Sequence, residues 1–118
     1  MAFKFEELDV YQRALNFAVS VINAVDRMET PRKHYRLIEQ LESSSSSVSL
    51  NISEGKGRYS KKEFRQFLYI SRGSLYETVT MLQILRKLNW LEEDPYKELY
   101  REAEEINKML SGLIKSII

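Results

Sequence analysis

Hydrophobic residues recur every three or four positions along most of the chain, which is the spacing of one face of an α-helix. The first such run extends from Leu8 to Met28, and a second passes from Leu41 to Ile52. A third run begins near Phe64, and a fourth occupies the last part of the chain. The pattern therefore predicts an all-α protein with four helices.

Short breaks between these runs carry residues that end or start helices. Thr30 followed by Pro31, and Asp94 followed by Pro95, each combine a capping side chain with a proline suited to the first helical position. Gly55 is the expected left-handed end of the second helix. The breaks thus divide the chain at three places.

The third helix starts with a capping box, in which Ser60 caps the helix and Glu63 reaches back to it. The four predicted helices cover about residues 7–28, 32–54, 60–90 and 95–117. Short connections between long helices make consecutive helices antiparallel. The sequence therefore predicts an up-down-up-down four-helix bundle that forms one domain over residues 1–118.

The serine run Ser43–Ser47 allows two interpretations. Serine-rich tracts are often flexible linkers, and a linker here would divide the chain into two domains. However, Leu41 and the stretch from Val48 to Ile52 keep the same helical phase across the run. Small residues also let a neighbouring backbone approach closely, so a continuous helix is the favoured interpretation.

Composition limits the class of protein further. The 118 residues are 43% hydrophobic and 30% charged, which fits a folded helical domain and argues against disorder. The chain has no cysteine, which excludes disulfides, thiol nucleophiles and cysteine-based metal sites. No apolar run approaches the roughly 20 residues that span a bilayer, and the first residues lack the apolar core of a signal peptide. We therefore expect a cytoplasmic protein with no membrane partner.

The predicted helices have wide apolar surfaces. On a helical wheel, the polar residues of the first helix fall within about 100°, and nearly all the rest of its surface is apolar. These polar residues are Asp9, Gln12, Arg13, Asn16, Ser20, Asn23 and Arg27. The third helix carries two apolar stripes: Phe64, Phe67, Leu68, Leu75, Leu82 and Leu85 in one, and Ile70, Met81, Ile84 and Leu88 in the other. Contact with two neighbours in a bundle explains part of this width, and the remainder predicts a homo-oligomer.

Few residues suit catalysis. His34 is the one histidine, so a di-iron site with two Glu-x-x-His motifs and a zinc site with several histidines are both excluded. The glycines do not form a phosphate-binding loop. Arg27 and His34 superficially match the Arg–His pair of helical ribonucleases of the HEPN type, but Thr30 and Pro31 lie between them. We predict a non-enzymatic protein without cofactor or metal, in which His34 is a solvated first-turn residue, and keep the ribonuclease as a distant alternative.

Charge is unevenly distributed, although the net charge is only +1. Residues 56–72 contain six Lys and Arg residues against Glu63 alone, whereas residues 92–105 contain seven acidic residues against Lys97 and Arg101. Such asymmetry indicates the kind of partner rather than the fold. The candidate nucleic-acid-binding residues are Lys56, Arg58, Lys61, Lys62, Arg65, Tyr69 and Arg72.

Several interpretations of these basic residues remain open. Lysine and arginine neutralise phosphates, and Tyr69 and Tyr76 lie among them as rings on which bases can stack. The start of the third helix adds free backbone amides that suit an anion. Alternatively, the basic residues form a solvated face, contact an acidic protein partner, or dock on the acidic start of the fourth helix in a neighbouring subunit.

A set of residues around the second break resembles the pattern of a known family. The set comprises Asn51-Ile52-Ser53-Glu54-Gly55, Gly57-Arg58, Ser60, Glu63-Phe64, Phe67-Leu68, Gly73-Ser74-Leu75 and Glu77. The segment Leu8–Gln12 and the region of Leu41 are also similar, so the likeness spans nearly the whole chain. The family is that of the bacterial 23S rRNA-intervening-sequence proteins.

The resemblance implies an all-α antiparallel bundle, and known members assemble as barrel-like homopentamers. A relative, the accessory variability determinant of diversity-generating retroelements, binds nucleic acid and a reverse transcriptase through basic surfaces. By resemblance we expect a homopentamer that binds RNA or DNA through the basic residues. The alternative is a protein–protein interaction scaffold with no nucleic-acid role.

Five of the family-like residues have plausible structural roles. Asn51 and Glu54, near the end of the second helix, are expected to satisfy backbone groups of the turn. Gly55 and Gly57 permit positive φ. Gly73 lies within a predicted helix, where glycine costs about 1 kcal/mol relative to alanine, so we expect a close helix–helix crossing there.

Overall fold

The computed structural model describes residues 2–28 and 34–117. These residues form a short 3-10 helix, η1 (Lys4–Glu7), and four α-helices, with no β-strand among them. The α-helices are α1 (Asp9–Arg27), α2 (Tyr35–Lys56), α3 (Lys61–Lys87) and α4 (Glu93–Ser116). The predicted cap and proline at Thr30 and Pro31 lie outside the described residues.

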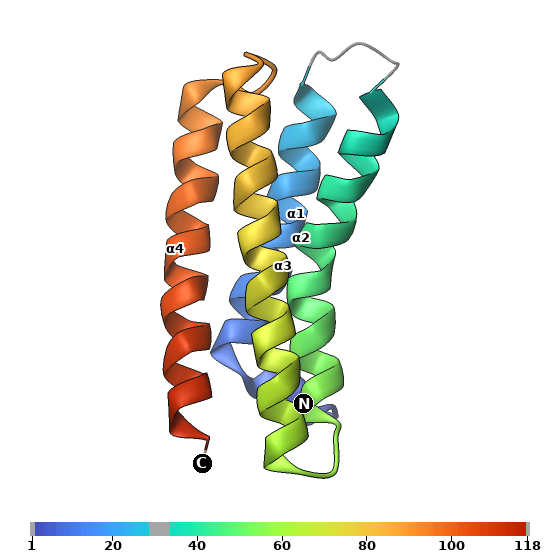
Figure 1. Ribbon diagram of the computed structural model, residues 1–118, viewed down its shortest axis with the longest axis vertical. Helices are drawn as coiled ribbons and strands as arrows, with labels where there is room; N and C mark the ends of the chain where they lie inside the picture. Colours follow the sequence, from blue (N-terminus) through green and yellow to red (C-terminus); the bar gives the residue numbers. More distant parts are fainter. Residues whose placement is uncertain (1, 29–33, 118) are drawn as a thin grey trace.

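Each α-helix runs antiparallel to the one before it, and the four lie along the long axis of a particle measuring 45 × 24 × 22 Å (Figure 1). Helix α1 packs against α2 and α4, and α3 packs against the same two helices, which closes the bundle. The α2–α3 turn lies at the same end of the bundle as η1 and the end of α4, and the α3–α4 turn lies at the other (Figure 1). The predicted all-α antiparallel bundle is therefore confirmed.

The helices share one hydrophobic core that extends along the bundle axis. All four α-helices and the α3–α4 turn contribute to it, because their apolar residues repeat at helical spacing. The buried core residues are Val10, Ala14, Phe17, Val21, Leu41, Val48, Ile52, Leu68, Leu75, Met81, Leu82, Leu85, Leu91, Leu99, Ala103, Ile106, Leu110 and Ile114. Burial of each large side chain contributes about 1.5–3 kcal/mol, and most of the stability comes from this cluster.

The serine run is helical throughout and lies in the middle of α2, so the linker interpretation is wrong. Two of its hydroxyls contact α3: Ser44 Oγ lies 2.9 Å from Thr78 Oγ1, and Ser47 Oγ lies 2.9 Å from Ser74 Oγ. In return, the hydroxyl of Ser71 donates to the backbone oxygen of Val48 at 2.7 Å. Small side chains allow α2 and α3 to pack closely, and the hydrogen bonds offset the cost of burying hydroxyl groups.

Gly55 does not end α2, contrary to the prediction. The helix continues through Gly55 to Lys56, and its C-cap, Gly57, has an ordinary φ of −81°. Gly55 is buried against α3, and a methyl group there would lie 2.5 Å from Cβ of Phe67. Glycine is therefore required at residue 55 for close helix packing rather than for a left-handed backbone.

The left-handed residue lies at the other end of α3, where Asn89 has a φ of 62°. The amide of Trp90 donates to the oxygen of Leu85, and the amide of Asn89 donates to the oxygen of Arg86, both at 3.1 Å. These two bonds form a Schellman motif, in which asparagine tolerates the conformation that glycine usually adopts. Helix α3 therefore ends at Lys87, before the predicted limit.

Helix α4 begins earlier than the Asp94–Pro95 pair predicts. Its N-cap is Glu92, whose side chain makes no capping hydrogen bond, and its first helical residue is Glu93. Pro95 is then the third helical residue rather than the first. Proline is tolerated there because amides in the first turn have no partner within the helix.

Two other expected structural roles are also corrected. Gly73 lies at no helix crossing within the subunit, because it is exposed and a methyl group there would have no heavy atom within 4 Å. The neighbouring Ser71 and Ser74 make the contact with α2 instead. The amide of Asn51 does not reach the turn and donates to the backbone oxygen of Ser47, one turn earlier in α2, at 2.8 Å.

Several large apolar side chains remain exposed on the bundle. They include Phe3 before η1, Leu15 and Val19 on α1, Leu50 on α2, Ile70 and Ile84 on α3, and Leu88 directly after α3. In the second predicted stripe of α3 only Met81 is buried, whereas the first stripe supplies core residues. Part of the polar side of α1 faces α4, since Arg13 pairs with Glu102 at 3.0 Å. The exposed apolar residues are thus spread over both the α1–α2 and the α3 surfaces.

Candidate nucleic-acid interface

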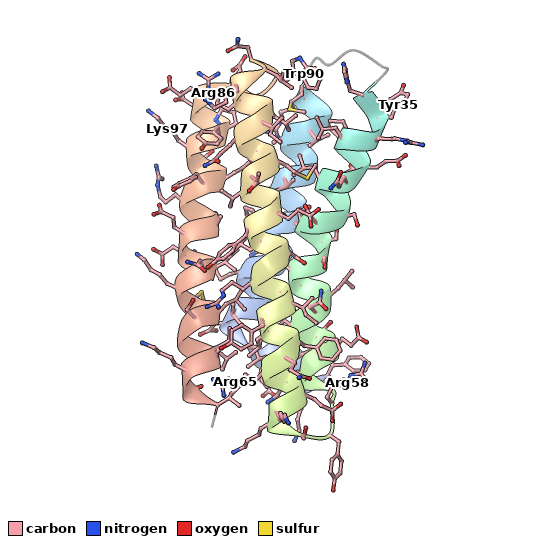
Figure 2. The ribbon with its side chains drawn as sticks, in the orientation of Figure 1. Tyr35, Arg58, Arg65, Arg86, Trp90 and Lys97 are labelled. Atoms are coloured by element: carbon pink, nitrogen blue, oxygen red, sulfur yellow. The ribbon has the colours of Figure 1, made fainter. Side chains whose placement is uncertain are left out.

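The predicted basic residues gather at the end of the bundle that carries the α2–α3 turn. We call the six cations the turn patch: Lys56, Arg58, Lys61, Lys62, Arg65 and Arg72. Arg58 and Arg65 lie at this end, far from Arg86 and Lys97 at the opposite end (Figure 2). All six belong to the end of α2, the turn, or the first half of α3, so local sequence brings them together.

The turn is held at both ends by hydrogen bonds. At the end of α2, the amide of Gly57 donates to the oxygen of Glu54 at 3.2 Å, and the amide of Arg58 donates to the oxygen of Gly55 at 3.1 Å. At the start of α3, Ser60 Oγ accepts from the amide of Glu63 at 3.2 Å, which confirms the predicted N-cap. The Glu63 carboxylate accepts from the Ser60 hydroxyl.

Aromatic rings support most of the cations of the turn patch. Lys56 lies over Phe64 at 5.4 Å from the ring centroid, and Arg58 lies over Phe67 at 4.8 Å. Arg65 and Arg72 both lie over Tyr69, at 5.9 and 5.1 Å. Each such cation–π contact contributes about 0.5–1 kcal/mol at an exposed site. The rings therefore restrict where the cationic groups lie without neutralising their charge.

Most of the turn patch carries no compensating charge. Arg58 pairs with Glu54 at 2.8 Å, and Arg72 donates to the hydroxyl of Ser111 at 3.1 Å. Within residues 2–28 and 34–117, every cation of the turn patch except Arg58 lacks an ion pair: Lys56, Lys61, Lys62, Arg65 and Arg72. An exposed pair such as Arg58–Glu54 is worth about 0–1 kcal/mol, so Arg58 can exchange its partner for a phosphate at little cost.

The tyrosines of α3 are less available than their positions in sequence indicate. The ring of Tyr69 is in contact with the guanidinium groups of both Arg65 and Arg72. The hydroxyl of Tyr76 donates to Asn107 Oδ1 of α4 at 3.1 Å. Sequence reasoning missed Tyr59, which lies in the turn and is fully exposed, at 102% of its reference area. Its position beside Arg58 and Lys61 was the available clue.

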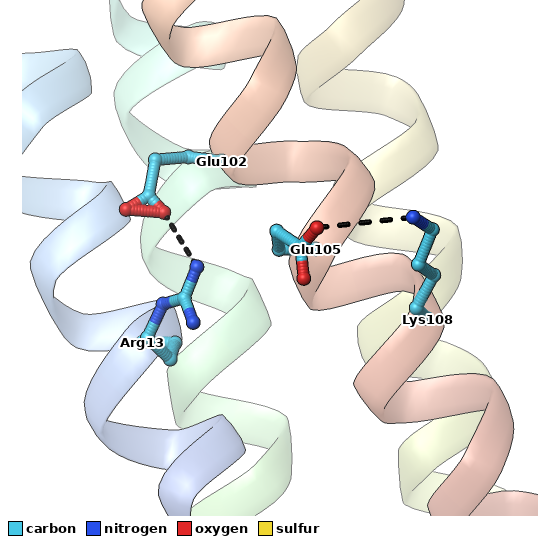
Figure 3. A network of polar contacts seen from close by, with 4 residues as sticks. All are labelled: Arg13, Glu102, Glu105 and Lys108. Carbon is cyan, nitrogen blue, oxygen red and sulfur yellow. Dashed lines mark hydrogen bonds and ion pairs between the residues drawn. The ribbon is translucent and has the colours of Figure 1, made fainter.

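The opposite end of the bundle has a different charge pattern. The acidic start of α4 lies there, and Glu93 pairs with Lys97 at 3.2 Å. A groove of about 490 Å³ between α1 and α4 carries both signs of charge, including the Arg13–Glu102 pair. Farther along α4, Glu105 lies 3.8 Å from Lys108 (Figure 3). Because residues 92–105 carry seven acidic residues against Lys97 and Arg101, this side is a weaker candidate for binding an anion.

Arg27 and His34 do not form a recognisable catalytic pair. Arg27 lines the α1–α4 groove. His34 precedes α2, is half-buried and lies 4.7 Å from the ring of Trp90 between ring centroids, so it is not the solvated residue that we expected. In the part of the chain that the structure describes, no hydrogen bond connects the two side chains, and no group of three or more His, Asp or Glu residues could hold a metal ion.

None of the helices in the described ranges is both long and apolar enough to cross a membrane. The α-helices instead pair apolar faces with charged ones, as helices of a water-exposed bundle do. The fold and the charge distribution together define a small antiparallel helical bundle with one strongly basic end.

The chain belongs to the family of 23S rRNA-intervening sequence proteins, whose family model matches residues 6–112. It is also similar to a crystal structure of a protein of unknown function from the S23 ribosomal protein family of Bacteroides thetaiotaomicron VPI-5482. The two are 27% identical with a TM-score of 0.80, and the match covers 90% of this chain and 98% of the other. No curated protein matches the chain.

Proposed function

We propose that this chain is a non-enzymatic, cytoplasmic, homo-oligomeric bundle that binds nucleic acid, RNA or DNA, through the turn patch. The observation that carries the proposal is the set of five turn-patch cations that form no ion pair among the described residues, in a chain with a net charge of only +1; they are Lys56, Lys61, Lys62, Arg65 and Arg72. A surface that gathers charge of one sign attracts partners of the opposite charge and speeds their association.

The geometry of the turn patch suits a phosphate backbone. Lysine and arginine groups that contact phosphates release condensed counterions, and this release supplies most of sequence-independent affinity. The cation–π contacts of Lys56, Arg58 and Arg65 limit the conformations of their side chains before binding. Less side-chain entropy is then lost when the nucleic acid binds.

Self-association is supported by the exposed apolar side chains. Val19, Leu50 and Ile70 expose 53%, 62% and 52% of their areas on three different helices. Gly73, one turn from Ile70, leaves bare backbone on the surface of α3 where a helix of another subunit could approach closely. Contacts between two different surfaces of identical subunits close into rings. A pentamer is the assembly that the family resemblance favours.

Assembly would strengthen binding at the turn patch. A parallel ring would place the turn patches of all subunits on one rim, and their linked contacts would raise the affinity for one nucleic-acid strand. The acidic start of α4 would lie on the opposite rim (Figure 2). Docking of the turn patch on that acidic segment would therefore need head-to-tail stacking of rings.

Charge reversal with a matched control tests the proposal. We expect the double variant Arg65→Glu and Arg72→Glu to lose binding of labelled RNA and DNA at low salt by about 100-fold or more, because two phosphate contacts become repulsive. The control, Lys87→Glu with Lys97→Glu, makes the same change in net charge at the opposite end and should retain binding. Equal loss in both variants, or no binding by the unmodified protein, would contradict the proposal.

The alternative is a scaffold that contacts an acidic protein surface through the same turn patch. It predicts no binding of RNA or DNA at about 50 mM salt, where a site with several phosphate contacts binds most tightly. It also predicts that an acidic protein, but no polynucleotide, competes for the turn patch.

A further inference from the structure

We propose that the turn patch recognises unpaired nucleotides, by stacking one base on the ring of Tyr59. This inference rests on the proposed function and narrows its ligand to single-stranded nucleic acid. It starts from a difference between Tyr59 and every other aromatic residue near the α2–α3 turn.

The neighbouring rings are already in use. Lys56 covers Phe64, Arg58 covers Phe67, and two arginines cover Tyr69. Tyr59 makes no aromatic or cation–π contact with any residue that the structure describes, and its side chain is fully exposed. Both faces of its ring are therefore open to a planar ligand.

The fold does not need an aromatic side chain at this residue. Tyr59 buries no surface, and the turn is held by backbone bonds at Gly57 and Arg58 and by the Ser60 cap. These bonds fix the backbone on both sides of Tyr59, so the position of its Cα relative to the turn patch is well defined. A rigid base carrying an exposed ring loses little entropy when a ligand stacks on it.

Cationic residues that could contact the phosphate backbone flank Tyr59 in the sequence. Arg58 precedes Tyr59, and Lys61 and Lys62 follow within three residues. Lys61 and Lys62 form no ion pair within the described ranges. A cationic surface combined with an open aromatic ring is the arrangement that binds single strands, where stacking contributes about 1–3 kcal/mol per base. In a duplex both faces of an internal base are already stacked on neighbouring bases, so that base cannot also stack on the ring of Tyr59.

The test compares a labelled single-stranded RNA of about 12 nucleotides with a blunt-ended duplex of the same sequence, which has no unpaired loop, at low salt. We expect tighter binding of the single strand. Tyr59→Ala should weaken it by about 5- to 150-fold, the equivalent of 1–3 kcal/mol, and should leave duplex binding unchanged. Tyr59→Phe should bind the single strand like the unmodified protein, because the stacking face is kept.

The matched control is Tyr35→Ala, which removes an exposed tyrosine at the opposite end of the bundle (Figure 2) and should have no effect. Equal binding of single strand and duplex, or an unchanged affinity for Tyr59→Ala, would overturn this inference and leave the proposed function standing. Absence of binding to either probe would overturn both. A changed sedimentation coefficient for Tyr59→Ala would instead assign Tyr59 to a subunit interface and would also overturn the inference.

Discussion

The two turns at the ends of α3 perform the same structural task with different residues. At the α3–α4 turn, Asn89 adopts the left-handed conformation, Trp90 packs on His34, and Leu91 is buried in the core. At the α2–α3 turn, a buried glycine and a serine cap complete the structure, while Tyr59 and the lysines project into solvent. Structural needs thus explain Asn89, Trp90 and Leu91 at the α3–α4 turn. At the α2–α3 turn, by contrast, Tyr59 and the lysines that project into solvent have no evident structural role in the subunit.

The largest stability effect is expected from Gly55→Ala. A methyl group at Gly55 would collide with Cβ of Phe67, at 2.5 Å, so α2 and α3 would have to move apart. Overpacking of this kind costs about 1–3 kcal/mol of unfolding free energy, which denaturant titration would measure. Gly57→Ala is the control, because its methyl group would meet no atom closer than 3.5 Å and should change stability by less than about 0.5 kcal/mol. Equal effects would show that the close approach at Gly55 is not real.

The α3–α4 turn should respond to Asn89→Ala. Alanine in the left-handed conformation is strained by about 1–2 kcal/mol, and asparagine by less. We therefore expect a loss of about 1 kcal/mol in thermal or chemical unfolding, whereas Asn89→Gly should keep or raise stability. If Asn89→Gly lowered the free energy of unfolding as much as Asn89→Ala does, the side chain of Asn89, rather than its backbone conformation, would be what stabilises this turn.

Replacing Gly73, the exposed glycine of α3, with alanine should raise the stability of the subunit, whereas Gly55→Ala and Asn89→Ala should lower it. Gly73→Ala removes the helix-propensity cost of glycine, and the added methyl group has no heavy atom within 4 Å. The free energy of unfolding of an isolated subunit should therefore rise by about 0.5–1 kcal/mol. Gly73→Leu should leave the helical content intact but shift the sedimentation coefficient toward that of a monomer, because the proposed neighbouring subunit would be displaced. An oligomer unaffected by Gly73→Leu would exclude Gly73 from the subunit interface.

The smallest effect is expected from Glu54→Gln at the α2–α3 turn. The exposed Arg58–Glu54 pair contributes about 0–1 kcal/mol to stability, so the free energy of unfolding should change little. Removal of the negative charge beside Arg58 should nevertheless tighten nucleic-acid binding to the turn patch a few-fold at low salt. A tighter complex without a change in stability would separate the binding role of Arg58 from its structural contact.

The number, order and direction of the helices could be predicted from sequence because each apolar stripe repeats at helical spacing. The cap at Ser60 could also be predicted, since a capping box is a local pattern. The serine run was ambiguous in sequence, because the residues of α3 that Ser44 and Ser47 contact lie far away in the chain. Local patterns were thus informative wherever local contacts determine the structure.

The roles of individual turn residues were harder to predict. A glycine near a helix end is compatible with a left-handed backbone or with close packing, and only the position of Phe67 decides between them for Gly55. The contact of His34 with Trp90 joins residues far apart in sequence. The basic cluster was visible in sequence, but the occupied ring of Tyr69 and the open ring of Tyr59 depend on side-chain placement.

The salt dependence of nucleic-acid affinity tests the central claim most directly. If the five cations without an ion pair each contact a phosphate, the logarithm of the binding constant should fall linearly with the logarithm of salt concentration. The expected slope per bound subunit is about −3.5 for a single strand and about −4.5 for a duplex. The Arg65→Glu and Arg72→Glu variant should bind too weakly for such a slope to be measured. A slope near zero, or no binding at about 50 mM salt, would contradict the assignment of the turn patch as a phosphate-binding surface.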